Sequence, residues 1–321
     1  MTLRPVAISC GEPAGIGPEI AVKAWRALGE ALALLWIGEP AHLPPKTPVT
    51  VVTSPEDAPR PGTLAVLHLP MPGAATPGRP APEQAAGVVA AIETGARLAM
   101  EGRVRALVTA PISKKALIDG AGFAFPGHTE YLADLAGVGR VVMMLAGPDL
   151  RVVPATIHIP LADVPGALTE ALIVETVEIT ARALARDFGV AAPRIAVAGL
   201  NPHAGEGGAI GREEIDIVIP ALATLRDKGF DVTGPLPADT MFHPRARAGH
   251  DAAVCMYHDQ ALVPLKTIAF DEGVNVTLGL PFVRTSPDHG TAFDIAGSGT
   301  ADATSMIAAI RLADAMARAR E

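Results

Sequence analysis

Residues 6–19, VAISCGEPAGIGPE, carry the pattern that decides the fold. The first four residues are apolar or small, which predicts a strand buried on both faces of a sheet. Gly15 and Gly17 allow a tight turn with close approach of the backbone, and a helix is expected directly after them. The segment lacks the G-x-G-x-x-G fingerprint of dinucleotide-binding Rossmann turns, because position 20 is Ile.

Short apolar runs of the same kind recur along the chain and predict further strands. Many of these runs do not alternate with polar residues, which is typical of strands covered on both faces. The predicted strands are Val6–Ser9, Ala33–Ile37, Val49–Val52, Leu64–Leu67, Ala106–Thr109, Val141–Leu145, Val152–Thr156, Ile195–Ala198, Ala253–Met256 and Val274–Leu278.

Between these runs, apolar residues recur at helical spacing. Three such faces predict helices, with Asp302 as the N-cap of the last. The three faces are Ile173, Val177, Leu184 and Phe188; Ile215, Ile219, Leu222 and Leu225; and Met306, Ile310 and Ala313. Strands that alternate with helices indicate an α/β fold with a largely parallel or mixed sheet.

Length and composition narrow the class of protein. A chain of 321 residues suggests about two domains. The net charge of −8 argues against a nucleic-acid or anionic-membrane binder, which would need a basic surface. Cys10 and Cys255 both lie in apolar runs, so we expect buried thiols in a reducing compartment. The apolar run at 31–38 is far shorter than the ~20 residues of a membrane span, and we predict a cytoplasmic protein.

Three histidines each follow a predicted strand or its loop: His158, His203 and His258. The carboxyl ends of parallel strands are where α/β proteins place their sites, so these side chains are candidates for one catalytic metal centre. The alternative is that each is a structural histidine, because spacings of 45 and 55 residues form no local metal motif.

A second group of polar residues suits an anion. In Gly127-His128-Thr129-Glu130 we expect a helix start, with Thr129 as the cap and His128 pointing outward. The same residues fit the capture of a phosphate or carboxylate.

Three further residues are candidates for that anion site. Lys266 follows the 259–265 stretch, Asn275 opens a predicted strand, and Arg284 follows one. With His128 and Thr129 they suit a phosphate, because a guanidinium offers a fixed fork of donors and an ammonium a point charge.

Taken together, these segments closely resemble the 4-hydroxythreonine-4-phosphate dehydrogenase family of vitamin B6 biosynthesis. The matching motifs run from residue 11 to about residue 302. They are GEPAGIGPE, GHTEYLA, NPHAGEGG, PADT, MYHDQ, LPFVRTSPDHGTAFDIAG and GTAD. The chain departs from the family at Glu12, where Asp is usual, and at Ser113, where Asn is usual.

The resemblance implies two α/β domains around a cleft, as in isocitrate and isopropylmalate dehydrogenases, with no Rossmann fingerprint. We expect residues 1–125 and 290–321 to form the first domain. Residues 126–289 would form the second domain and carry most metal and substrate ligands. The family also implies a homodimer whose subunits share the active site.

The resemblance also assigns roles to residues. It implies NAD or NADP and a divalent metal, Zn, Mg, Mn or Co, held by His158, His203 and His258. Substrate contacts map onto His128, Thr129, Lys266, Asn275 and Arg284. Lys266 and Asp239 become the catalytic candidates, and Ser113, Lys114 and Gly207 are weaker candidates for contacts with the nicotinamide cofactor.

The expected reaction is the NAD(P)-dependent oxidation and metal-assisted decarboxylation of 4-phosphohydroxy-L-threonine to 3-amino-2-oxopropyl phosphate. One alternative is a sister dehydrogenase that acts on another hydroxy acid or on a cis-dihydrodiol carboxylate. A second is a metal-dependent hydrolase or lyase, because a three-histidine metal suits that chemistry equally well. A non-catalytic metabolite-binding protein is a third. No nucleic-acid or membrane partner is expected.

Overall fold

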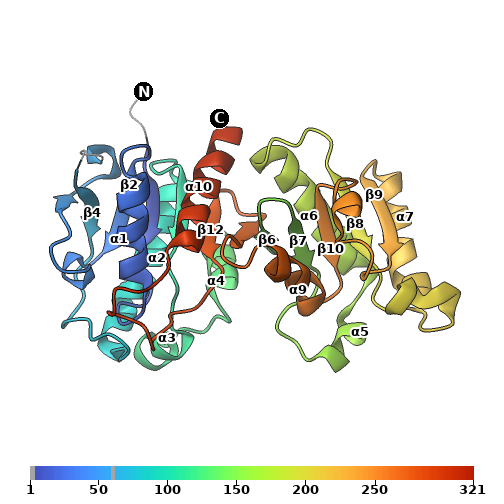
Figure 1. The fold of residues 1–321 in the computed structure, drawn as a ribbon, viewed down its shortest axis with the longest axis horizontal. Coiled ribbons are helices and arrows are strands. Elements are labelled where there is room, and N and C mark those ends of the chain that lie inside the picture. The colour runs from blue at the N-terminus through green and yellow to red at the C-terminus, as the bar shows by residue number, and fades with distance from the viewer. Residues whose placement is uncertain (1–3, 59–61) are drawn as a thin grey trace. The chain divides into compact units, whose positions relative to one another are not determined.

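The structure is a computed structural model that describes residues 4–58 and 62–321 (Figure 1). Its strands and helices gather into two compact units. The second unit is Val141–Gly279, and the first is built from the chain on either side of it. None of the helices in the described ranges is long and apolar enough to cross a membrane.

The boundaries of these units differ from those expected. Residues 126–140 and 280–289 belong to the first unit rather than the second. The reason is their packing: the helix at 128–135 contacts the helix at 85–100, and the strand at 284–287 pairs with the strand at 106–109. The predicted anion-site residues His128, Thr129 and Arg284 therefore lie in the first unit.

The sheet of the first unit is parallel in every strand pair of the described part. Its strand order is β3-β4-β2-β1-β5-β12. The strands are β1 (Val6–Ser9), β2 (Leu34–Gly38), β3 (Val49–Val52), β4 (Leu64–His68), β5 (Ala106–Thr109) and β12 (Arg284–Pro287).

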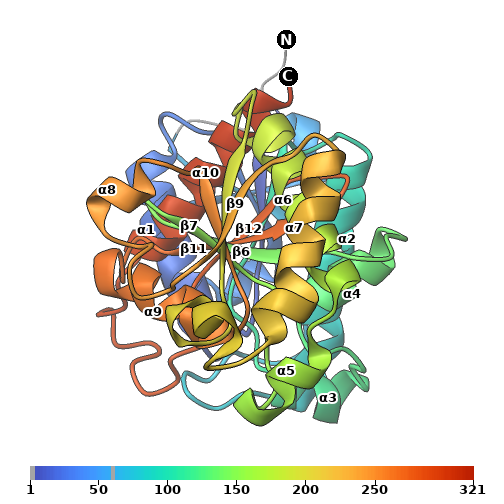
Figure 2. The ribbon, with the colours of Figure 1, turned by 90° about the vertical axis from the view of Figure 1, so that its right-hand side faces the viewer.

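Helices cover both faces of this sheet, which explains its apolar strands (Figure 2). One face is covered by α2, and the other by α10 with α1 beside it. The helices of the unit are α1 (Gly17–Leu28), α2 (Ala85–Met100), α3 (Lys114–Ala121), α4 (His128–Leu135) and α10 (Thr304–Ala319). Its short 3-10 turns are η1 (Pro40–His42), η2 (Pro55–Asp57) and η3 (Pro82–Gln84).

The sheet of the second unit is mixed, with the order β11-β6-β7-β10-β8-β9. The pairs β11/β6 and β6/β7 are antiparallel, and the remaining pairs are parallel. The strands are β6 (Val142–Ala146), β7 (Arg151–Pro154), β8 (Arg194–Ala198), β9 (Asp231–Leu236), β10 (Ala252–Cys255) and β11 (Val274–Leu278).

One face of this second sheet packs against α6, and the other against α9. The core under α9 is formed by buried side chains that include Leu145, Val152 and Leu265. The helices are α5 (Val164–Ala167), α6 (Glu170–Asp187), α7 (Ile219–Asp227), α8 (Pro244–Arg247) and α9 (His258–Ile268). Shorter or irregular turns are η4 (Leu161–Asp163), η5 (Pro202–Gly208) and the π-helix η6 (Glu214–Val218).

All ten predicted strands are present; four have the predicted bounds, and the ends of the others differ by one or two residues. Sequence analysis missed β9, which contains a Gly-Pro pair, and β12, whose sequence is the polar RTSP. Arg284 therefore begins a strand rather than following one.

The three predicted helices are also present, and one face needs a correction. Ile219 is 46% exposed rather than buried, although Leu222 and Leu225 are buried. The five residues of η6 precede it, and a π-helical turn shifts the phase of the helical pattern. Before α10, Asp302 accepts a hydrogen bond from the Thr304 amide, as a residue at a helix start should.

Each unit holds one buried cysteine, as the sequence predicts. Cys10 follows β1 and Cys255 ends β10. Burial raises the pKa of the Cys10 thiol to about 12 and also raises that of Cys255.

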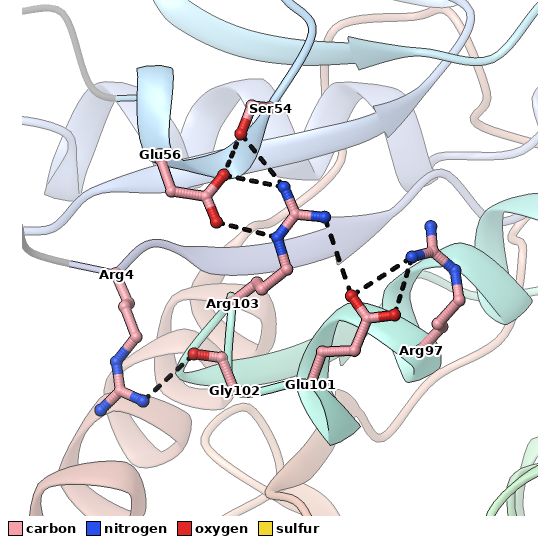
Figure 3. Close-up of polar contacts among 7 residues, drawn as sticks. All are labelled: Arg4, Ser54, Glu56, Arg97, Glu101, Gly102 and Arg103. Atoms are coloured by element: carbon pink, nitrogen blue, oxygen red, sulfur yellow. Dashed lines mark hydrogen bonds and ion pairs between the residues drawn. The ribbon is translucent and has the colours of Figure 1, made fainter.

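A surface network of charges joins three segments of the first unit (Figure 3). Arg103 binds Glu56 through two nitrogens, each 2.8 Å from a carboxylate oxygen, and also contacts Ser54 and Glu101. Glu101 in turn pairs with Arg97. The guanidinium of Arg103 lowers the pKa of Glu56 to about 2, so the pair stays ionised far into acid.

Candidate active site

Arg284 lies at the centre of the first unit's polar site. It is the first residue of β12, and only 3% of it is exposed. Its guanidinium donates a hydrogen bond of 2.6 Å to Oγ1 of Thr109, at the end of β5. Burial lowers the pKa of Arg284 to about 10, which still leaves it protonated at neutral pH. A buried, permanently charged arginine is suited to binding an anion.

His128 opens α4 beside this arginine, and its ring is not turned outward as expected. Its Nε2 is buried and has no hydrogen-bond partner among the described residues. Burial, followed by the nearby charges of Arg284 and Lys114, holds the pKa of His128 well below its usual value. The ring is therefore neutral at pH 7 and can donate one hydrogen bond without adding charge.

Thr129 does not cap α4. Gly127 occupies the N-cap position in an extended conformation, and no side chain caps the helix there. Instead, an aromatic group formed by Phe123, Phe125 and Tyr131 supports this end of α4, with ring centroids 4.9–5.6 Å apart. The Tyr131 hydroxyl donates to Glu93 on α2. The start of α4 is thus fixed by packing rather than by a capping box.

Two candidates for cofactor contacts, Ser113 and Lys114, lie in the same unit. The Ser113 hydroxyl accepts a hydrogen bond from the Ala116 amide and caps α3. Lys114 is exposed, and a Cβ built on Gly127 would lie 3.9 Å from its Nζ. Lys114 therefore lies beside the anion site, and its contact with a cofactor stays a prediction.

The glycine turn that opens the chain is tightly packed. A Cβ on Gly11 would lie 2.4 Å from the Pro111 carbonyl oxygen, and one on Gly15 would lie 2.9 Å from the carbonyl oxygen of Thr291. Glu12 is buried, and burial raises the pKa of its carboxyl. Only glycine fits at these two positions, and the amide of Ile16 binds the Thr291 carbonyl oxygen, which holds the loop after β12 against the start of α1.

In the second unit, two of the three predicted histidines lie together. The rings of His158 and His258 have centroids 5.7 Å apart, and both line a cavity of about 270 Å³ with Thr156, Tyr257 and Asp259. Nδ1 of His258 lies 2.7 Å from the Asp259 carboxylate. That contact leaves Nε2 as the nitrogen able to bind a metal, the usual arrangement of a carboxylate behind a metal-binding imidazole.

His203 is exposed and does not complete a metal cluster with the pair. Among residues 4–58 and 62–321, no three His, Cys, Asp or Glu side chains are grouped closely enough to hold a metal ion. His203 lies on η5, in a run from 203 to 207 whose φ angles are all positive, from 46° to 79°. Each non-glycine residue in such a run costs roughly 1–2 kcal/mol, so the surrounding structure must stabilise it.

Glu214, which sequence reasoning missed, binds Asn201 two residues before this run. Its buried carboxylate accepts the Asn201 amide at 2.7 Å and the Asn201 side-chain Nδ2 at 3.0 Å. Gln260, also unassigned from the sequence, donates to the Gly199 carbonyl oxygen and accepts the Met256 amide. Gln260 stands within the MYHDQ motif, which was the signal for it; Glu214 lies outside every recognised motif.

The remaining predicted residues of the second unit are not all brought together. Lys266 lies two turns after His258 on α9, and its Nζ is 5.5 Å from the Phe270 ring centroid. Asn275 is on β11, opposite Leu145 of β6. Asp239 is exposed and makes no hydrogen bond or ion pair within the described part of the chain. Gly207 has no atom near its Cβ position.

Comparison with known proteins shows the family to which the chain belongs. The family model "Pyridoxal phosphate biosynthetic protein PdxA" matches residues 24–313. The chain belongs to the PdxA family. It is 61% identical to 4-hydroxythreonine-4-phosphate dehydrogenase of Roseobacter denitrificans over 98% of this chain and 97% of that protein.

Solved structures of PdxA proteins have the same fold. The crystal structure of the 4-hydroxythreonine-4-phosphate dehydrogenase of Klebsiella pneumoniae superimposes with a TM-score of 0.90 at 41% identity, covering 98% of this chain and 99% of that one. A terephthalate 1,2-cis-dihydrodiol dehydrogenase from Burkholderia xenovorans is more distant, with a TM-score of 0.69 at 31% identity over 98% of both chains.

The predicted fold class is confirmed. A β-decarboxylating dehydrogenase from Thermococcus kodakarensis has a TM-score of 0.50 at 14% identity, covering 97% of this chain and 82% of that one. At that identity the likeness concerns the fold alone. It agrees with the α/β architecture of isocitrate-type dehydrogenases that the sequence predicts for this PdxA family member.

Proposed function

We propose that this chain oxidises 4-phosphohydroxy-L-threonine with NAD or NADP and releases carbon dioxide, giving 3-amino-2-oxopropyl phosphate. The observation that carries the proposal is the 61% identity, over nearly the whole length, to a protein named for this dehydrogenase activity. The chain is an enzyme of the dehydrogenase class, since relatives up to 61% identical and a solved structure with a TM-score of 0.90 are named as this dehydrogenase.

The first unit supplies groups that suit the substrate's phosphate. Arg284 offers a buried positive charge, and His128 offers a neutral N–H donor close to it. Thr129, in the first turn of α4, adds a hydroxyl and lies where backbone amides face outward from the helix. Binding energy from this remote group would orient the carbon that is oxidised. Lys266 and Asn275 of the second unit stay predicted contacts.

The second unit supplies imidazoles that suit a divalent metal. His158 and His258 are close enough to share one ion, and the Asp259 carboxylate orients His258. We retain the predicted homodimer, in which one of the three histidines comes from the partner subunit. Because His203 lies apart from the other two, the third ligand would be His203 of the partner subunit. Nitrogen ligands favour zinc or cobalt over magnesium, with manganese between them.

When bound, such a metal lowers the pKa of a coordinated hydroxyl and polarises a neighbouring carbonyl group. A bound nicotinamide would accept hydride from the hydroxyl-bearing carbon while the hydroxyl proton is lost. The resulting β-keto acid would then release carbon dioxide, and the enolate that remains would take up a proton to give the amino ketone. Lys266 is the candidate for moving a proton, and Asp239 the candidate for orienting a water or ligand.

The alternative functions are less well supported. The dihydrodiol dehydrogenase shares 31% identity with this chain, about half the value for the phosphate-specific relative. A hydrolase or lyase would not explain membership in a dehydrogenase family.

The test is formation of reduced nicotinamide by the purified full-length protein. The substrate is 4-phosphohydroxy-L-threonine with NAD or NADP, before and after a chelator, and 4-hydroxy-L-threonine is the control. We expect reduction that needs metal and the phosphate. A folded, metal-loaded protein that reduces neither cofactor would reject the proposal and move the assignment to the dihydrodiol substrates.

A further inference from the structure

The loop between β8 and η6 encloses a carboxylate that the proposed reaction does not use. Glu214 is 2% exposed and lies at the first residue of η6. Its two oxygens accept the backbone amide and the side-chain amide of Asn201, at 2.7 and 3.0 Å. Glu214 thus binds the backbone amide of Asn201 and shares its side-chain amide with Glu213, which accepts the same Nδ2 at 2.7 Å, two residues before the left-handed run begins.

The left-handed run wraps closely around this carboxylate. A Cβ on Gly205 would lie 2.5 Å from Oε2 of Glu214, and a Cβ on Gly199 would lie 3.0 Å from Oε1. Gly205 lies two residues after His203 in the same run. The carboxylate therefore packs directly against the backbone of the segment that carries the imidazole.

The same network reaches the histidine pair. Gln260 joins the carbonyl oxygen of Gly199 to the Met256 amide, two residues before His258. The loop that holds His203 and the loop that holds His258 thus share one hydrogen-bonded frame. Glu214 joins the same hydrogen-bonded network by binding Asn201, two residues after Gly199.

We propose that Glu214 is a positioning residue that sets the orientation in which His203 is presented to the metal. The proposal rests on the proposed function, in which His203 is a metal ligand. Glu214 itself binds neither metal nor substrate in this assignment. Its role is to hold His203 to Gly207 in the left-handed conformation.

The experiment measures zinc affinity by competition with a chelating dye, using the full-length protein. Glu214→Gln keeps the shape of the side chain but places an N–H donor opposite one of the two Asn201 donors. Gly205→Ala attacks the same contact from the loop side, at φ +79°. Asp216→Asn is the matched control, because Asp216 lies on the same π-helix but is exposed and paired with Arg212.

We expect Glu214→Gln and Gly205→Ala each to weaken zinc binding about 10-fold or more, the usual effect of losing a residue that orients a ligand. Asp216→Asn should bind zinc as the unaltered protein does. In the cobalt-substituted protein, the visible absorption bands should change with the first two variants only. Circular dichroism and thermal unfolding show whether each variant is folded. If Glu214 had a purely structural role, its replacement would lower the unfolding temperature without changing the cobalt spectrum of the folded protein.

Three results would overturn the proposal. The first is a folded Glu214→Gln protein with unaltered zinc affinity and cobalt spectrum. The second is an equal loss of zinc affinity in Asp216→Asn. The third is loss of folding in both Glu214→Gln and Gly205→Ala, which would make the contact a requirement of the fold; if only the first fails to fold, the second decides.

His203→Ala separates this proposal from the function on which it rests. If His203→Ala leaves zinc affinity unchanged, the metal role of His203 is wrong, and the positioning role fails with it. If His203→Ala loses zinc but Glu214→Gln does not, only the positioning role is wrong.

Discussion

The two units hold their polar groups in opposite ways. In the first, Arg284 lies in a strand and His128 opens a helix, so regular backbone places both side chains. In the second, His158 and His203 lie in loops with positive φ angles of 53° and 52°. Burial in regular structure sets the charge of a group, whereas an unusual loop sets the direction of a ligand. His258 opens α9 as His128 opens α4, so the difference between the units lies at His158 and His203.

The largest expected effect lies in the second unit, at His203. His203→Ala should abolish turnover and weaken metal binding by more than the roughly 10–100-fold effect of residues that only orient a ligand. Metal content after dialysis, measured by atomic emission, checks it. Metal retained at the level of the unaltered protein would contradict the comparison of the two units, because η5 would then carry no metal ligand.

In the first unit, Arg284→Ala should raise KM for the phosphorylated substrate about 10–100-fold. Hydrogen bonds to charged groups contribute about 1.5–3 kcal/mol, and Arg284 offers its charge from a buried position. Steady-state kinetics with 4-hydroxy-L-threonine as the second substrate provides the control. An equal loss with both substrates would show that Arg284 supports the fold and does not read the phosphate.

His128 allows a smaller test of how burial sets charge. Its folded pKa lies below the unfolded value near 6.5, so the unfolded chain binds the proton first. Stability from this group is complete above pH 6.5 and declines as the pH falls toward the folded pKa. Between pH 6.5 and 5.5 the unaltered protein should lose about 1 kcal/mol more than His128→Gln, because the unfolded imidazole is already half protonated at pH 6.5. Urea unfolding at both pH values measures the difference, and parallel curves for the two proteins would contradict it.

The smallest effect is expected at the surface network of Figure 3. Glu56→Gln removes an ion pair that is fully formed at neutral pH, but water screens the pair. We expect no measurable change in the urea midpoint at pH 7. A clear loss of stability would contradict this expectation. It would mean that an exposed ion pair contributes as much to the free energy of unfolding as a buried charged group does.

Much of this fold could be predicted from the sequence because buried strands consist of short runs of apolar residues. The strand at 106–109 is ALVT and every residue in it is buried. The strand at 284–287 escaped because its polar residues are stabilised by distant partners: Thr109 binds Arg284, and Thr285 donates to the Ala309 carbonyl oxygen. Such contacts join residues 24 to 175 positions apart, and no local pattern records them.

The candidate site shows the same division. The motifs identified the histidines and Arg284 as residue types, but the neutral state of His128 follows from burial that only the folded chain creates. Thr129 was predicted as a cap because its hydroxyl stands where a loop meets a helix, yet Gly127 takes the cap position and the aromatic rings fix the helix. Glu214 carried no signal, because its partner Asn201 lies across a loop of unusual backbone.

The two buried thiols give each unit its own reporter. Cys10 and Cys255 are both enclosed and have raised pKa values, so an alkylating reagent reaches either only when its unit opens. Peptide mapping after timed labelling would then yield two opening rates from one sample of unmodified protein. A bound phosphate compound should slow labelling of Cys10, and a bound metal should slow that of Cys255. The chain thus reports, without added probes, which half each ligand stabilises.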